Sequence, residues 1–299
     1  TFNPELPVGE YARIYIQTGA VRNQGLELAL NYNNTWKDFT WNTGVTYSMN
    51  KNKILTLADN AINPITGEKF SISSLNMGGL GSTRFILKEG GSMGDIYSLM
   101  DLKRDANGAV YIDENNSVVT ESLEANNYIK LGSVLPKGNL AWRNNFSWKN
   151  INVAFLVSAR LGGVVFSRTQ AVLDNFGVSE ASAAARDKGY VSVNGNDRVN
   201  PEGWYSVVAG GTAVPQYYIY SATNIRLQEA SIGYTIPRKW LGNVCDIKVS
   251  LIGRNLWMIY NKAPFDPESV ASTDNFYQGI DYFMMPSLRN IGFNLSFKF

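Results

Sequence analysis

The sequence lacks several residue types and patterns that mark common classes of protein. Its 299 residues include no histidine and one cysteine, and no apolar run approaches the ~20 residues of a transmembrane helix. Histidine is the commonest general base and metal ligand, and no defensible pair of catalytic carboxylates replaces it, so we expect no enzyme and no metal or cofactor site. Cys245 has no second cysteine to pair with, which excludes an internal disulfide framework.

Charge of one sign is also scarce. The 27 Lys and Arg residues nearly balance the 25 Asp and Glu residues, and the net charge of +2 comes from scattered positions. A nucleic-acid-binding protein concentrates basic residues in a patch or stripe, so we expect no nucleic-acid partner.

Aromatic residues and glycine are plentiful, with 16 Tyr, 14 Phe, 7 Trp and 27 Gly. Short apolar runs alternate with Asn, Gly and Ser, a pattern typical of strands and turns. The sequence therefore predicts an all-β fold.

The closing segment 288–299 gives the clearest strand signal. Its apolar and polar residues alternate, so one face of the strand is apolar and the other is small and polar. The same alternation recurs in 25–33, 39–50, 140–148 and 151–161, and further strands are expected near 82–89, 93–101, 223–236 and 246–259. The apolar set of the closing strand is Ile291, Phe293, Leu295, Phe297 and Phe299.

Charged residues follow this alternation. Five of them lie in the polar phase of their strands: Glu27, Arg143, Arg160, Lys248 and Lys298. A Lys or Arg facing lipid at the middle of a bilayer costs ~2–4 kcal/mol, so a membrane barrel requires this separation. A soluble β-sandwich also keeps charge off its core face, so the separation alone leaves both folds open.

The lengths of the connections favour the membrane barrel. The expected connections are 34–38, 51–81, 90–92, 102–137, 149–150, 163–222, 237–245 and 261–286, and short and long alternate throughout. Outer-membrane barrels have short turns at one membrane surface and long loops at the other. The aromatic residues Trp36, Phe39, Trp41, Trp148 and Trp240 lie near or within the short connections, where interfacial aromatic rings are expected.

Two stretches break the alternation, and one long connection contains a helix signal. The residues around 225–230 and 253–257 change phase, which predicts a β-bulge in each strand. The alanine-rich segment 179–187 predicts a helix within the long connection 163–222.

Several motifs together resemble the carboxyl-terminal barrel of SusC/RagA-type TonB-dependent outer-membrane transporters. They are VRNQGLELALNY (21–32), IRLQEASIGYTIPRKW (225–240), GRNLW (253–257) and RNIGFNLSFKF (289–299). The order of the last three is the most specific part of the resemblance. The chain departs from the family pattern at Ser98-Leu99, where a Gly-Tyr pair often stands.

The resemblance implies a fold and a domain organisation. It implies that residues 1–299 form the carboxyl-terminal strands of an antiparallel transmembrane β-barrel of roughly 22 strands, with the plug domain outside this chain. Nine strands are expected here. The absence of an initial Met and of a signal peptide leads us to expect a processed chain or a piece of a longer polypeptide.

The resemblance also implies a function and partners. It implies an importer of oligosaccharides or peptides in the bacterial outer membrane, energised through TonB and working with a SusD-like surface lipoprotein. Glu27, Arg143 and Arg160 would then face the lumen. Phe293, Leu295, Phe297 and Phe299 resemble the terminal signal read by the barrel-assembly machinery.

Aromatic residues in the long connections are candidate contacts for a ligand or a partner, because aromatic faces stack on sugars and peptides. These candidates are Trp204, Tyr205, Tyr217, Tyr218, Phe276 and Tyr277. Packing between loops is the alternative interpretation of the same residues.

Two other functions remain open at this point. A passive porin or an outer-membrane adhesin would have the same strands without energy coupling. A soluble β-sandwich binding module would bury the apolar faces against each other.

Overall fold

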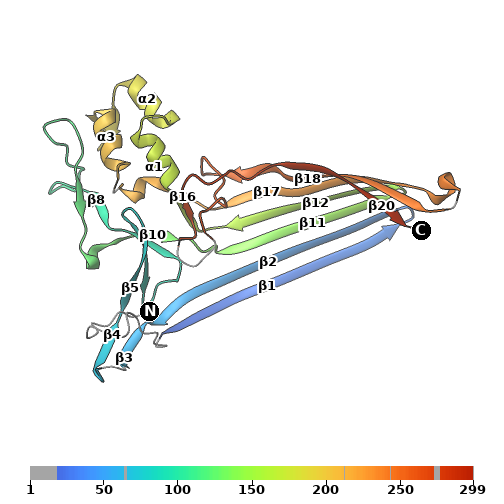
Figure 1. Ribbon diagram of the computed structural model, residues 1–299, viewed down its shortest axis with the longest axis horizontal. Helices are drawn as coiled ribbons and strands as arrows, with labels where there is room; N and C mark the ends of the chain where they lie inside the picture. The colour runs from blue at the N-terminus through green and yellow to red at the C-terminus, as the bar shows by residue number, and fades with distance from the viewer. Residues whose placement is uncertain (1–18, 64–65, 212, 243, 273–276, 299) are drawn as a thin grey trace, which may run out of the picture.

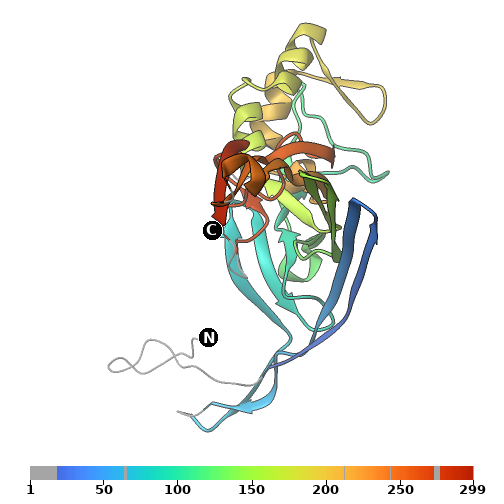
Figure 2. The ribbon, with the colours of Figure 1, turned by 90° about the vertical axis from the view of Figure 1, so that its right-hand side faces the viewer.

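The computed structural model describes residues 19–63, 66–211, 213–242, 244–272 and 277–298. Its largest element is a seven-stranded antiparallel sheet in the order β1-β2-β11-β12-β17-β18-β20. The strands are β1 (Ala20–Trp36), β2 (Phe39–Thr56), β11 (Gly138–Trp148), β12 (Ile151–Leu161), β17 (Asn224–Ile236), β18 (Asp246–Asn261) and β20 (Asn290–Lys298). Seen from the end with the short turns, the strands follow an open arc, with β1 and β20 at its two edges (Figure 2).

The strand register gives the sheet one apolar face and one polar face. One row across the apolar face joins Leu30, Val45, Trp142, Val157, Leu227 and Trp257. The next row but one joins Trp41, Phe146, Val153, Ile232, Leu251 and Phe293. Between Leu26 and Trp36 on β1, and at the positions paired with them on the other strands, the described apolar face carries no charged residue.

Polar side chains interrupt the apolar face at Thr43 and Asn144, and each accepts a hydrogen bond from a tryptophan. Thr43 and Asn144 are opposite each other on β2 and β11. The indole Nε1 of Trp142 donates to the Thr43 hydroxyl, and that of Trp41 donates to the Asn144 side-chain oxygen, both at 3.1 Å. These hydrogen bonds lower the free-energy cost of placing polar atoms on an otherwise apolar face.

The apolar face is open rather than packed. Leu30 is 71% exposed, Ile291 71% and Phe293 77%. The buried hydrophobic cluster of the described residues contains no residue of the seven strands. In a soluble β-sandwich a second sheet would cover this face, so the exposure excludes that alternative.

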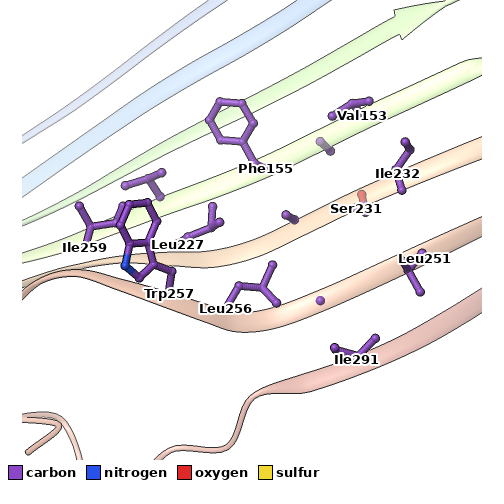
Figure 3. A pocket seen from close by; sticks show the side chains of 14 residues that line it. Val153, Phe155, Leu227, Ser231, Ile232, Leu251, Leu256, Trp257, Ile259 and Ile291 are labelled. Carbon is purple, nitrogen blue, oxygen red and sulfur yellow. The ribbon is translucent and has the colours of Figure 1, made fainter.

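The apolar face also has a shallow hollow of about 590 Å³ (Figure 3). It lies over β12, β17, β18 and β20 and is lined by side chains such as Phe155, Leu227, Leu256 and Ile291. Leu256 folds back over Gly253, where an added Cβ would lie 2.5 Å from the leucine Cδ2. A side chain at position 253 would therefore require Leu256 to move aside.

Both predicted bulges are confirmed. The register between β17 and β18 shifts between Leu227 and Glu229, and again between Ile225 and Arg226. Asn255 has a φ of 51°, a left-handed conformation that accommodates the extra residues of β18. The bulges restore the alternation, so that Trp257 shares a row with Leu227 on the apolar face.

The connections at one end are short. The turn between β1 and β2 is Lys37-Asp38 and that between β11 and β12 is Lys149-Asn150, with left-handed φ angles of 53° and 50° at the lysines. Between β17 and β18 lies the short 3-10 helix η3 (Arg238–Leu241). Trp36, Trp148 and Trp240 are all exposed at this end, on the right in Figure 1.

The long connections gather at the opposite end and form what we call the loop assembly (Figure 1). It contains a four-stranded sheet of β5 (Ser74–Leu80), β6 (Thr83–Lys88), β7 (Asp95–Ser98) and β10 (Ile129–Ser133). A three-stranded sheet joins β13 (Val164–Ser167), β16 (Ile219–Ser221) and β19 (Ile280–Asp281). Three strand pairs complete its β-structure: β3 (Ala58–Ile62) with β4 (Lys69–Ile72), β8 (Met100–Leu102) with β9 (Thr120–Ser122), and β14 (Val191–Val193) with β15 (Asp197–Val199).

The loop assembly also holds the helices and the hydrophobic core. The helices are α1 (Arg168–Asn175), α2 (Glu180–Lys188) and α3 (Pro201–Val208), with the 3-10 turns η1 (Ala125–Asn127) and η2 (Pro215–Tyr218). Helix α2 confirms the helix predicted for 179–187, and the Ser179 side chain accepts from the backbone N–H of Ser182 at its start. Phe85, Ile96 and Phe166 are among the largest fully buried side chains of the core.

The prediction that nine strands form the barrel sheet is wrong. The strands expected near 82–89 and 93–101 exist as β6 and β7, but they belong to the four-stranded sheet of the loop assembly, and β2 pairs directly with β11. At six and four residues they are shorter than the ~9–11 residues a barrel strand needs to cross a bilayer. The connection 90–92 is therefore part of a long loop, and the alternation of short and long connections holds for the seven remaining strands.

No helix in the described part of the chain is both long and apolar enough to cross a membrane.

The two faces of β20 allow a direct test of which environment each one meets. Phe293→Arg puts a charge on the apolar face, and we expect it to lower the free energy of unfolding in lipid vesicles by about 2–4 kcal/mol. Asn294→Arg, the adjacent position on the polar face, is the matched control and should change it little. Urea unfolding of the purified protein in vesicles measures both, and equal losses for the two variants would contradict the assignment of the faces.

Candidate functional site

A row of polar side chains crosses the polar face close to the loop assembly. The register aligns Glu27, Ser48, Asn139, Arg160 and Asn224 on five successive strands. Glu27 and Arg160 line a hollow of about 570 Å³, together with Thr46, Ser158 and Glu268. The hollow thus carries both signs of charge and several hydroxyl groups, which suits a polar ligand or a polar protein segment.

A buried ionic cluster shares Glu268 with this hollow. The Arg226 Nη2 atom on β17 is 2.8 Å from Asp266 Oδ1 and 3.0 Å from Glu268 Oε2, both in the last long connection. The side chains of Arg226 and Asp266 are only 7% and 9% exposed. Asn224 accepts from Arg226 Nε at 3.2 Å and donates to Glu268 at 3.3 Å. The cluster attaches the last loop to the polar face of the sheet.

Asp266 has its charge stabilised in this cluster. Burial on its own raises the pKa of the carboxyl group, but hydrogen bonds from Arg226, from the Ser287 hydroxyl and from the Glu268 backbone N–H lower it by more. The net result is a pKa below the ordinary value, so Asp266 remains ionised at neutral pH.

Arg160 connects the polar face to another part of the loop assembly. Its Nη2 atom donates to the Val134 carbonyl oxygen at 2.8 Å. Arg160 and Glu268 also line a second, smaller hollow of about 180 Å³ that extends toward Val164 and Gln278. These two residues therefore stand where the polar face meets the long loops.

The third predicted charge lies farther along the same face. Arg143 shares a row with Asn31, Gly44, Glu229 and Arg254. Within that row Glu229 and Arg254 form an ion pair at 3.0 Å. Glu27, Arg143 and Arg160 thus all lie on the polar face, and only Glu27 and Arg160 line one hollow.

The loop aromatics differ in their surroundings. Tyr218 is 3% exposed and its hydroxyl donates to Asp174 at 3.0 Å, so the packing of loops explains this residue. Burial and the neighbouring Asp174 carboxylate raise its pKa. Trp204 and Tyr217 stack edge to face with ring centroids 5.2 Å apart, and Tyr217 remains partly exposed.

Tyr205 and Tyr277 have more open positions. Tyr205 lines a hollow of about 480 Å³ among α1, α2 and α3, with Asp174, Arg186 and Glu202. Tyr277 is 43% exposed, and its ring centroid is 6.3 Å from that of Phe85. Phe276 lies outside the described residues.

The predicted terminal signal is partly within the described chain. Phe293, Leu295 and Phe297 lie exposed on the apolar face of β20, at an edge of the sheet. Phe299 lies outside the described residues.

Sequence reasoning missed the ionic cluster. Arg226, Asp266 and Glu268 were not among the predicted site residues, because Asp266 and Glu268 belong to a loop with no periodic pattern. The available signal was Arg226 itself, a charged residue within a strand next to a bulge, where an ionic partner is required if the side chain is buried. No group of His, Cys, Asp or Glu suited to a metal occurs among residues that the structure describes.

Comparisons with known proteins agree with this geometry. No family model matches the chain. Two TonB-dependent receptors of Formosa agariphila do, P3 with 25% identity over 98% of this chain and P26 with 28% identity over 94%. The chain is a relative of the TonB-dependent receptors. It spans about 30% of the length of P3 and 29% of P26.

Solved structures show a shared fold. The RagAB peptide importer in its closed-closed state matches with a TM-score of 0.65 at 16% identity, over 94% of this chain and 30% of the other. Its open-open state matches with a TM-score of 0.64 at 17% identity, over 94% and 29%. The predicted resemblance to SusC/RagA-type TonB-dependent receptors and the predicted antiparallel barrel fold are therefore confirmed.

The ionic cluster gives a prediction about the last loop of this TonB-dependent receptor relative. Asp266→Asn removes one of the two carboxylates that pair with the buried Arg226. We expect the free energy of local opening of the last loop to fall by about 3 kcal/mol. This is the lower end of the range for a broken buried ion pair, because Glu268 remains as a partner. Ser287→Ala, which removes one neutral donor, should cost about 1 kcal/mol. Amide hydrogen exchange of the loop measures both, and equal protection in Asp266→Asn and the unmodified protein would rule out the role of the pair.

The same carboxyl group predicts a dependence of stability on pH. Because the folded-state pKa of Asp266 is lowered, its contribution is present in full above the ordinary carboxyl pKa of about 4 and is lost as the pH falls through the folded-state value. The stability difference between the unmodified protein and Asp266→Asn should therefore shrink between neutral pH and about pH 2. Thermal unfolding in detergent across this range measures it, and a difference that stays constant would contradict the lowered pKa.

Proposed function

We propose that this chain forms part of the wall and the mouth of an active transporter in the bacterial outer membrane, which imports oligosaccharides or peptides. The observation that carries the proposal is the open apolar face of the seven-stranded sheet, opposite a face that holds the charges. Hydrocarbon is the environment that an exposed apolar strand face requires, and the polar face then borders a water-filled lumen.

The dimensions of the sheet support this orientation. On β2 the apolar face runs from Phe39 to Met49, and on β12 from Ile151 to Leu161, close to the ~9–11 residues of a strand that crosses a bilayer. Exposed tryptophans at the short-turn end suit a membrane interface. The loop assembly then lies outside the cell, as the long loops of outer-membrane barrels do.

The polar face and the loop assembly give the proposed import path. Glu27, Arg143 and Arg160 face the lumen, and the hollow beside Glu27 and Arg160 lies on the path below the loops. Tyr205, Tyr217 and Tyr277 are the candidate ligand or partner contacts, because each retains exposure or lines a hollow. Tyr218 is not among them, because its ring is buried.

The relatives support energy coupling and a partner. By analogy with TonB-dependent receptors, a plug and a TonB-contacting segment outside this chain couple import to the inner membrane. The likeness to the RagAB peptide importer supports a peptide as one of the two ligand classes and a SusD-like surface lipoprotein as the partner that covers the mouth.

Energy coupling is the feature that separates this proposal from a passive porin or adhesin. Deletion of the TonB-contacting segment in the full-length protein should abolish growth on the imported oligosaccharide or peptide as sole carbon source, while barrel assembly stays intact. Comparison of oligosaccharide and peptide media identifies the ligand class. Growth that is unchanged by the deletion would favour the porin.

The terminal strand gives a second test. We propose that the apolar side chains at the end of the chain are read by the barrel-assembly machinery. Deletion of Phe299 in the full-length protein should reduce the amount of heat-modifiable barrel at the cell surface, and Lys298→Gln, a polar-phase change next to it, should not. Normal assembly without Phe299 would refute this role.

A further inference from the structure

Three cations stand on the apolar-face side of β1 and β2, just beyond the apolar residues. On the apolar face, Leu26 and Met49 are the last apolar pair of these strands on the way to the loop assembly. The next pairs on the same side are Gln24 with Lys51 and Arg22 with Lys53. Two like charges directly opposite each other destabilise a strand pair unless an anion lies between them.

The neighbouring asparagines fix the direction of these cations. Asn52 donates to Asn23 at 2.9 Å, and its side-chain oxygen accepts from the Met93 backbone N–H at 2.8 Å. Asn52 therefore points toward the polar side and the loop assembly. Because successive side chains of a strand alternate, Lys51 and Lys53 point to the other side, where the apolar face continues.

These cations have no partner within the described chain. Arg22, Lys51 and Lys53 take part in no ion pair among the described residues. By contrast, Arg226 and Arg254 on the polar face both have carboxylate partners. The three cations on the apolar-face side of β1 and β2 thus lack a carboxylate partner among the described residues.

A hollow of about 470 Å³ adjoins this group. Lys51, Lys130 and Lys137 line it together with Met49 and Leu135. Asn50 and Asn52 line it as well, so residues from both sides of β2 border this hollow. Its carboxylate, Asp95, is already bonded to Lys130 and to the Ser92 hydroxyl. The hollow therefore has an excess of positive charge next to apolar side chains.

We propose that Arg22, Lys51 and Lys53, with the adjoining hollow, bind the phosphate-bearing headgroup of an anionic lipid. This inference rests on the proposed membrane orientation, in which Met49 marks the upper limit of the hydrocarbon. Lys51 then lies at the level of the headgroups, where each basic residue attracts an anionic surface. Met49 and Leu135 contact the start of an acyl chain, which free phosphate lacks.

Lipid binding to the purified full-length protein in detergent tests the proposal. Native mass spectrometry with phosphatidylglycerol and phosphatidylcholine should show a preference for the anionic lipid. In the double variant Lys51→Gln/Lys53→Gln that preference should fall about 25-fold, or about fivefold for each lysine. The matched control is Lys69→Gln/Lys88→Gln, which makes the same charge change at two exposed positions of the loop assembly and should keep the preference.

The other outcomes each have a definite meaning. Equal binding of the two lipids, or an unchanged preference in the Lys51/Lys53 variant, would overturn the proposal. Displacement of phosphatidylglycerol by millimolar inorganic phosphate would also overturn it, because the site would then recognise the free anion. A protein that stays monodisperse without detergent or lipid would instead refute the membrane orientation and the proposed function beneath it.

Discussion

The environment of one apolar sheet face is the constraint on which the rest of the structure depends. Seven strands put leucine, valine, phenylalanine and tryptophan side chains in rows on one side, and the described chain offers nothing to cover them. In water such a face would drive association with another apolar surface, since the stabilisation from burial grows with apolar area. In hydrocarbon it requires no cover, and each strand needs only backbone partners at its two edges.

The same constraint explains how charge is distributed. Polar groups on the apolar face are few and bonded to indole N–H groups, as Thr43 and Asn144 are. Charged side chains lie on the other face of the sheet. Arg226, the most buried of them, forms ion pairs with two carboxylates of the last loop. Beyond Met49 the apolar-face side no longer excludes charge, because Lys51 and Lys53 lie on that side without an ion-pair partner among the described residues. The position at which charged residues first occur on this side is the proposed boundary between hydrocarbon and headgroups.

The loop assembly is stabilised differently from the sheet. Its strands are short, and its core is closed around residues such as Phe85 and Phe166, as in a water-soluble domain. This core gives the long connections a fixed shape, so they can hold Tyr205 beside a hollow and attach Asp266 to the sheet. In the proposed transporter, the loop assembly would form a mouth of fixed shape above a polar lumen wall.

The sequence by itself determined the all-β class, the two faces, the bulges and the alternation of short and long connections, because a strand side chain points to a face set by its position alone. It did not determine that β6 and β7 leave the wall, since a short strand with apolar residues has the same local pattern in a loop domain as in a barrel. Nor did it find the partners of Arg226, because Asp266 and Glu268 are brought to it only by the path of a loop 40 residues downstream in the chain. Register and loop path are long-range contacts, and only the tertiary structure decided them.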